Sequence, residues 1–284
     1  MKKASDDMTK ATRRDRIAPA FPAEGRQSDG TTRAESGTQL EEGNGAANGG
    51  RAYFVSDLHL FASRSMAHLW LEAIQRAARD ARLFVLGGDI FDFRWAHHGS
   101  LGYAVEAAAV WLAELARACP ECRFEFLLGN HDYHQGFLDR LDGVQAGAPN
   151  FSWHRFYYRR NGAIFLHGDV ADRFSTAESL AHRRAQWLHR KQRGPVWQRL
   201  YDWAVAGQLH RSLPVMVYPR RTVARRILHY LRDIGQGPEA GVRHVYFGHT
   251  HREMSHYRYG GIEFHNGGAP IKGTRFRIVE AVVD

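Results

Sequence analysis

Five short motifs rich in aspartate and histidine each follow an apolar segment of this 284-residue chain. In chain order they are Asp57-Leu58-His59, Gly88-Asp89, Gly129-Asn130-His131-Asp132, His167-Gly168-Asp169 and Gly248-His249-Thr250-His251. The segments that precede them are residues 52–55, 83–86, 124–128, 163–166 and 242–247. Short apolar runs rich in β-branched and aromatic residues predict buried strands. We therefore expect polar side chains from distant parts of the sequence to meet where neighbouring strands end.

The side chains of these motifs combine carboxylates, imidazoles and one amide. This mixed oxygen and nitrogen set suits Mn²⁺, Fe²⁺ or Zn²⁺, whereas Mg²⁺ and Ca²⁺ prefer oxygen ligands throughout. Two cations about 3.5 to 4 Å apart need a carboxylate between them. Asp89 follows two glycines, so no bulky neighbour blocks it, and we expect it to bridge the two ions. The sequence thus predicts a site for two divalent cations, Mn²⁺ foremost, at which a shared water loses its proton near neutral pH.

The spacing of apolar residues predicts the fold class. Helical periodicity over residues 65–79 and 103–118, between the first three strands, predicts a βαβαβ series with helices packed on a sheet. Hairpins follow: strands 151–158 and 163–166 join at Asn161-Gly162, and strands 255–259 and 262–265 join at Gly260-Gly261. A last strand is expected within residues 276–283. This order predicts an α+β protein built as a four-layer αββα sandwich.

The first fifty residues differ in composition from the rest. They contain no valine, tryptophan or tyrosine and one residue each of phenylalanine, isoleucine and leucine. Such a segment buries too little apolar surface to offset its ordering entropy, so residues 1–50 are predicted to be a disordered tail before a domain at 51–284. No apolar run approaches the roughly 18 residues of a membrane span, and no apolar signal core opens the chain. We expect a cytoplasmic protein, with Cys119 and Cys122 as reduced thiols.

Together, the sequences D-L-H, G-G-D, G-N-H-D, H-G-D and G-H-T-H resemble those of the calcineurin-like metallophosphoesterase superfamily. The resemblance covers residues 51–284 and is loose over 170–243. It implies two ligand sets that share one carboxylate: Asp57, His59, Asp89 and His251 for one metal, and Asp89, Asn130, His167 and His249 for the other. It also implies that His131 acts as the acid that protonates the leaving oxygen, and that Asp132 orients its imidazole.

Most of the positive charge lies between the fourth and fifth motifs. Residues 171–233 hold thirteen Lys or Arg against four acids, an excess equal to the net charge of +9 of the whole chain. Three apolar stripes at helical spacing accompany these cations. We interpret residues 171–240 as a basic helical insertion that caps the metal site and binds an anionic head group or an anionic membrane. The residues expected to bind substrate are Arg183, Arg184, Arg190 and Arg252. The alternative is a solvated basic hairpin without a role in substrate binding.

Within the superfamily, the insertion and the sequences D-L-H-L and G-H-T-H-R resemble those of UDP-2,3-diacylglucosamine pyrophosphohydrolases. The chain departs from that group at His131, where those enzymes usually carry arginine, so the resemblance specifies the two-metal chemistry more firmly than the substrate. We expect hydrolysis of a phosphoester or pyrophosphate bond in a phosphorylated small molecule or lipid, with peripheral contact to the inner membrane. A nuclease or nucleotide phosphodiesterase is the alternative enzyme, because the basic segment would also attract nucleic acid. A metal-free scaffold of the same fold is the alternative outside enzymes.

Overall fold

The computed structural model describes residues 50–96, 100–189 and 218–283. Residues 1–49 of the predicted tail, Arg190 and the second apolar stripe of the predicted insertion lie outside these ranges. Among the described residues, no helix has the length and apolar character needed to cross a membrane.

The first sheet has the strand order β10-β1-β2-β3-β4. Its strands are β1 (Arg51–Val55), β2 (Ala81–Leu86), β3 (Arg123–Leu127), β4 (Phe151–His154) and β10 (Val279–Ala281). Strands β1 to β4 run parallel, and β10 pairs with β1 in the antiparallel sense. Parallel strands place their carboxyl ends on one edge, which is where the first three motifs begin.

Three helices cover the outer face of this sheet: α1 (Leu71–Arg79), α2 (Leu101–Ala118) and α3 (Gln135–Gly147). A short 3₁₀ helix, η1 (Ala67–Leu69), precedes α1. Helix α2 begins at Ser100, whose hydroxyl accepts a hydrogen bond from the Tyr103 amide, as expected of an N-cap. Helix α3 was not predicted from the sequence. It begins at His134, whose Nδ1 accepts from the Gly136 amide.

The second sheet has the order β5-β6-β7-β9-β8. Its strands are β5 (Tyr157–Arg160), β6 (Ala163–Leu166), β7 (His244–Phe247), β8 (Met254–Tyr259) and β9 (Ile262–Asn266). Strands β6, β7 and β9 are parallel. The predicted hairpin strand 151–158 is in fact two strands, because the chain leaves β4 in the first sheet and enters β5 in the second. Periodicity indicates which face of a strand is buried, but not which sheet the strand joins.

Two helices lie on the outer side of the second sheet: α4 (Ala177–Ala185) and α7 (Arg220–Asp233). The 3₁₀ turns η2 (Asp169–Ala171) and η3 (Pro238–Ala240) flank them in sequence. Ile227 and Leu231 of α7 belong to the same buried cluster as Phe247 and Phe264 of the sheet. The last apolar stripe of the predicted insertion therefore lies on α7 and faces the core, and this helix is part of a layer of the sandwich.

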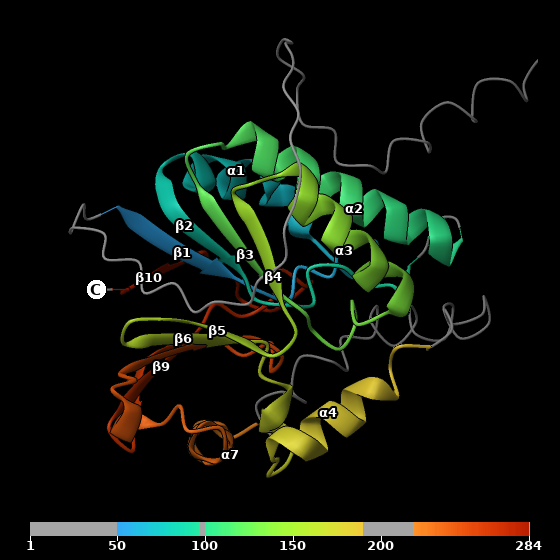
Figure 1. Ribbon diagram of the computed structural model, residues 1–284. Helices are drawn as coiled ribbons and strands as arrows, with labels where there is room; N and C mark the ends of the chain where they lie inside the picture. Colours follow the sequence, from blue (N-terminus) through green and yellow to red (C-terminus); the bar gives the residue numbers. More distant parts are fainter. Residues whose placement is uncertain (1–49, 97–99, 190–217, 284) are drawn as a thin grey trace, which may run out of the picture.

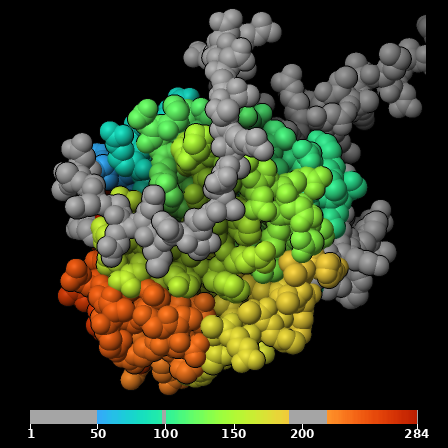
Figure 2. Space-filling view, viewed as in Figure 1, coloured from blue at the N-terminus to red at the C-terminus, as the bar shows by residue number. Residues whose placement is uncertain are grey.

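Figure 1 shows the resulting order of layers: helices α1 to α3, the first sheet, the second sheet, and helices α4 and α7. Between the sheets, the buried rings of Phe54, Phe165 and Tyr246 pack together. In Figure 2 the orange and yellow segments, which include α7 and α4, form the lower part of the surface against the green first half of the domain. The predicted α+β class and αββα sandwich are confirmed.

Candidate metal centre

The candidate ligands all follow the carboxyl ends of strands. By strand they are Asp57 and His59 after β1, Asp89 after β2, Asn130 after β3, His167 after β6, and His249 and His251 after β7. Strands β1, β2 and β3 are mutually parallel, as are β6 and β7. The two sheets pack face to face, and their motif-bearing ends meet at one rim of the sandwich, as hydrogen bonds between the two sets of loops show.

Five of these residues adopt the left-handed backbone conformation. Their φ angles are 55° at Asp57, 47° at His59, 52° at Asp89, 67° at His249 and 51° at His251. Aspartate and histidine tolerate this region better than bulkier side chains, but it remains sparsely populated. Backbone hydrogen bonds enforce it, for example from the Asp57 amide to Gly88 O at 3.0 Å and from the His59 amide to Asp89 O at 2.9 Å. Such strain gathers at functional sites.

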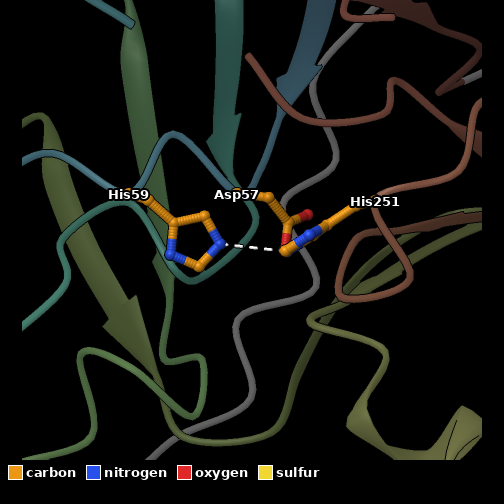
Figure 3. Close-up of side chains that lie close together, drawn as sticks. All are labelled: Asp57, His59 and His251. Atoms are coloured by element: carbon orange, nitrogen blue, oxygen red, sulfur yellow. Dashed lines mark hydrogen bonds and ion pairs between the residues drawn. The ribbon is translucent and has the colours of Figure 1, made fainter. Parts of the chain in front are cut away.

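Asp57, His59 and His251 form the first candidate metal site. One donor atom from each lies within 4.8 Å of the other two. The Nε2 atoms of His59 and His251 are 3.0 Å apart, and His251 Nε2 is 3.5 Å from Asp57 Oδ1. Figure 3 shows the three side chains pointing toward one another. The structure thus brings together three of the four residues predicted for one metal.

Asp89, His167 and His249 form the second candidate site, by the same measure. Asn130 lies among them: its Oδ1 is 3.1 Å from His167 Nε2 and 3.0 Å from His249 Nδ1. His167 Nε2 is 3.4 Å from Asp89 Oδ2. All four residues predicted for the other metal therefore converge, and Asp89 is the predicted member of both sets.

The electrostatics of both clusters suit cations. Burial, together with the nearby Arg64 guanidinium, lowers the pKa of His59 to about 3, so its imidazole is neutral and able to bind a metal. Burial opposes the charge on His167, yet the carboxylate of Asp89 prevails and raises its pKa to about 10. A divalent ion at this position would replace that proton, because only the deprotonated nitrogen is a ligand. The donor types and their spacing fit two divalent cations.

His131 lies beside these clusters and contacts Asp92. Its Nδ1 is 2.9 Å from Asp92 Oδ1, and its backbone amide donates to Asp89 Oδ1 at 2.7 Å. Burial disfavours the imidazolium, but the Asp92 and Asp89 carboxylates outweigh it and raise the pKa of His131. A histidine whose pKa is raised by neighbouring carboxylates has the properties of a general acid.

The aspartate that contacts the His131 ring is Asp92, whereas this contact was expected of Asp132. The two oxygens of Asp132 accept backbone hydrogen bonds, from Gly129 at 2.6 Å and from Ile90 at 3.0 Å. Asp132 therefore fixes the loops after β2 and β3. Sequence reasoning missed Asp92, which lies three residues after Asp89 in the loop that follows β2.

Arg184, predicted to bind substrate, is buried and paired. It is 1% exposed, and its Nε and Nη2 donate to the two oxygens of Asp169 at 3.1 and 2.7 Å. Its guanidinium also donates to the backbone oxygen of Arg155. A bidentate pair of this kind ties α4 to the turn after β6. In this structure the donors of Arg184, which was predicted to bind substrate, are directed at Asp169 and at the backbone oxygen of Arg155.

The other predicted substrate residues differ among themselves. Arg183 is half-buried and donates to the backbone oxygen of Asp169 at 3.1 Å and to the Ser175 hydroxyl at 3.4 Å. Arg252 is half-buried and donates to the backbone oxygen of Tyr218 at 2.8 Å. Arg190 lies outside the described residues.

A small pocket opens next to His131. Its lining consists of Phe93, Arg94, Asn130, His131, Tyr133, His134 and Trp187. Trp187 follows helix α4, whereas the other lining residues come from the loops after β2 and β3. The pocket therefore joins candidate metal-centre residues to an aromatic surface that the first part of the predicted insertion completes.

Residues 50–253 match the family model described as calcineurin-like phosphoesterase. The UDP-2,3-diacylglucosamine hydrolase of Haemophilus ducreyi is 24% identical over 216 residues, which covers 72% of this chain and 86% of that protein. The hydrolase of the same name from Pasteurella multocida is 22% identical over 217 residues, 73% of this chain and 84% of that protein. A solved dimetal phosphatase from Danio rerio superposes with a TM-score of 0.41 at 13% identity, over 78% of this chain and 88% of that one.

The family match confirms the predicted class of enzyme, a metal-dependent hydrolase of phosphoester or pyrophosphate bonds. Calcineurin-like phosphoesterases use a centre of two divalent ions, and this chain carries candidate ligand clusters for it. Since the match spans more than half of the sequence, the chain belongs to the calcineurin-like phosphoesterase family.

Proposed function

We propose that this enzyme hydrolyses the pyrophosphate bond of a UDP-linked, diacylated sugar, with two Mn²⁺ ions as cofactors. The observation that carries the proposal is the convergence of two ligand clusters and of His131, paired with Asp92, beside an aromatic pocket. Relatives named UDP-2,3-diacylglucosamine hydrolase, which align over more than four-fifths of their own length, support the substrate class.

The candidate ligands of the rim form two sets, one for each metal ion. Asp57, His59 and His251 would hold one ion, and Asn130, His167 and His249 the other, with Asp89 shared between them. Bound divalent ions would supply an activated water as nucleophile and neutralise phosphoryl charge. Positive groups stabilise a developing negative charge best when they are already held in place. The backbone hydrogen bonds between the rim loops hold the candidate ligands in this way.

His131 is proposed as the proton donor to the leaving phosphate. Its Nδ1 faces Asp92, so Nε2 remains to donate to an oxygen at the rim. The side chain is 17% exposed, which lets it reach a substrate while its buried partner, Asp92, is fully shielded. Proton donation by a positioned histidine typically contributes a factor of about 10² to 10⁴ in rate.

The pocket supports a substrate with a planar or apolar part next to its phosphates. Phe93, Tyr133 and Trp187 supply aromatic surface at the same place where Asn130 and His131 supply polar groups. These three aromatic residues are mostly buried, so the pocket as it stands is small and would have to widen to admit part of a substrate. A phosphomonoester without a large substituent would leave these walls unused.

The decisive experiment compares UDP-2,3-diacylglucosamine with its deacylated form at equal concentrations of Mn²⁺-loaded enzyme. We expect the acylated substrate to have a kcat/KM at least tenfold higher, and equal values would refute the lipid assignment. The same assay is run with a panel of other substrates: a cyclic nucleotide, single-stranded DNA and p-nitrophenyl phosphate. Parallel assays of metal-stripped protein reloaded with Mn²⁺, Fe²⁺ or Zn²⁺ test the choice of ion, and highest activity with another ion would refute manganese.

A nucleic-acid phosphodiesterase is the second candidate. Arg220, Arg221 and Arg225 of α7 are exposed on the surface and would attract a phosphate backbone. In that case single-stranded DNA would be the best substrate of the panel, and its cleavage would fall steeply with salt.

Peripheral contact with an anionic membrane is also proposed. Phe174 is 50% exposed, and the Arg225 guanidinium lies 5.2 Å from the centre of its ring. An exposed aromatic ring beside arginines suits the interface of an anionic bilayer. Sedimentation with vesicles containing phosphatidylglycerol should capture the enzyme, and Phe174→Ala with Arg225→Ala should release it; no sedimentation of the wild type would refute the contact.

A further inference from the structure

A group of two histidines and one glutamate lies on strands β7 and β9 of the second sheet, apart from the candidate metal centre. His244 begins β7, and Glu263 and His265 are on β9. One donor atom from each lies within 4.8 Å of the other two. In the parallel register of β7 and β9, His244 is opposite Glu263 and Tyr246 is opposite His265. Side chains alternate along a strand, so all four share one face of the sheet.

This cluster is separate from the candidate metal centre. The rim ligands follow the end of β7, whereas His244 is the first residue of that strand. Between the two sites lies Tyr246, which packs in the core between the sheets and stacks on the His265 ring at 4.7 Å. The two sites share no residue, and they lie toward opposite ends of the same strands.

Two imidazole nitrogens of the cluster are buried without a hydrogen-bond partner among the described residues: His265 Nε2 and His244 Nδ1. His265 is 2% exposed, and its Nε2 lies 3.6 Å from Glu263 Oε1. Burial, which outweighs the Glu263 charge, lowers the pKa of His265 to about 4, so the ring is neutral at pH 7. A buried neutral nitrogen with no donor aimed at it is a free ligand atom, and leaving it unpaired costs free energy.

Glu263 supplies the negative charge. The His256 imidazole, which hydrogen-bonds to Oε1, lowers the pKa of this carboxylate, and Arg258 lies 3.4 Å from Oε2. His256 comes from β8, where the pairing with β9 shifts register between Met254 and Tyr257, and it has a φ of 50°. A β-bulge of this kind redirects a side chain. The irregularity brings a third imidazole to the same carboxylate.

We propose that His244, Glu263 and His265 bind a third divalent ion, Zn²⁺ in the first place, distinct from the two of the catalytic centre. Two imidazoles and one carboxylate are a common protein ligand set for zinc, at about 2.0 to 2.2 Å from the ion. The donor atoms lie within 4.8 Å of one another, and the side chains would rotate to close on one ion. The ion would link β7 and β9 beside the edge strand β8, so its effect is on stability.

The test removes the catalytic ligands first. In an Asp57→Ala/Asp89→Ala/His167→Ala background, which removes ligands from both rim clusters, titration with Co²⁺ should reveal one site with the visible absorption of a four-coordinate ion. Adding Glu263→Gln should weaken this site at least tenfold, and adding His244→Gln should do the same. The matched control is His68→Gln, at an exposed histidine on η1, which should leave the titration unchanged. Glu263 is partly buried, and Glu263→Gln keeps the size of the side chain, so this replacement tests the site without emptying the core.

A second measurement does not depend on spectroscopy. Zn²⁺ should raise the Tm of the background protein in a concentration-dependent way, because an ion that binds only the folded state stabilises it. The Glu263→Gln variant should lose this response. A Co²⁺ titration without a bound site, or a site and a Zn²⁺ response that persist in both Glu263→Gln and His244→Gln, would overturn the proposal. Neither measurement uses activity, so failure of the proposed substrate leaves this result intact.

Discussion

The strand-end rim and helix α4 both carry charged side chains, but they differ in backbone geometry. Candidate ligands such as Asp57 and His249 are held at positive φ, in a region that side chains rarely adopt. Helix α4 instead begins with a regular capping box between Thr176 and Ser179, and its Arg184 forms a complete buried ion pair. Polar groups that the fold needs sit in relaxed geometry with their partners. Five of the seven candidate ligands instead sit in strained backbone geometry, where their own loops hold them.

The largest expected effect is at Asp89, where the rim would lose its shared carboxylate. Asp89→Asn retains the shape and the acceptor for the His131 amide, so the fold should persist. The loss of charge should remove several kcal/mol of transition-state stabilisation, or roughly 10³-fold or more in kcat/KM. Steady-state kinetics and metal analysis check this together. Near-normal turnover with two bound ions would show that Asp89 does not bridge.

The effect of Arg184→Met should be of similar size, but on stability. Breaking this buried ion pair leaves the Asp169 carboxylate buried without its partner, which lowers the free energy of unfolding by about 3 to 5 kcal/mol. Urea denaturation measures the loss. The double variant with Asp169→Leu should recover part of it, because no uncompensated charge then remains. A variant of normal stability with a raised KM would instead restore the substrate role that the sequence suggested.

The same contrast explains what could be predicted from the sequence. Candidate ligands such as His167 and His251 could be picked out from the sequence because an apolar strand followed by a histidine or aspartate is a local pattern. Arg184 was not, because its burial depends on Asp169, a partner in another element. Asp92 was missed for a related reason: its contact with His131 exists only once the loops after β2 and β3 are packed together. Local patterns placed the rim, and tertiary contacts decided how the charges near it are used.

A middle-sized effect should distinguish Asp92 from Asp132. Asp92→Asn removes the charge beside His131, and kcat should fall by about 10²-fold while KM changes little. Asp132→Asn should instead lower stability by about 1 to 3 kcal/mol, because one of two buried backbone donors loses its acceptor. Each variant is the control for the other. If Asp132→Asn lowered kcat as strongly as Asp92→Asn at unchanged stability, the role first predicted for Asp132 would be reinstated.

The smallest effect should be at Arg183, which lies next to Arg184 in α4 but is only half-buried. Its two hydrogen bonds, to Asp169 O and to the Ser175 hydroxyl, are within reach of solvent, so Arg183→Ala should cost about 1 kcal/mol in unfolding free energy. These contacts support the turn after β6. We therefore expect KM for the preferred substrate to change by no more than about twofold, which is well below the tenfold change that corresponds to 1.36 kcal/mol. Arg183→Lys, which retains the charge but not the fork of donors, is the matched control. A tenfold rise in KM for Arg183→Ala, with a normal KM for Arg183→Lys, would place this charge at the substrate. Helix α4 would then contain one arginine that supports the fold, Arg184, and one that binds substrate, Arg183.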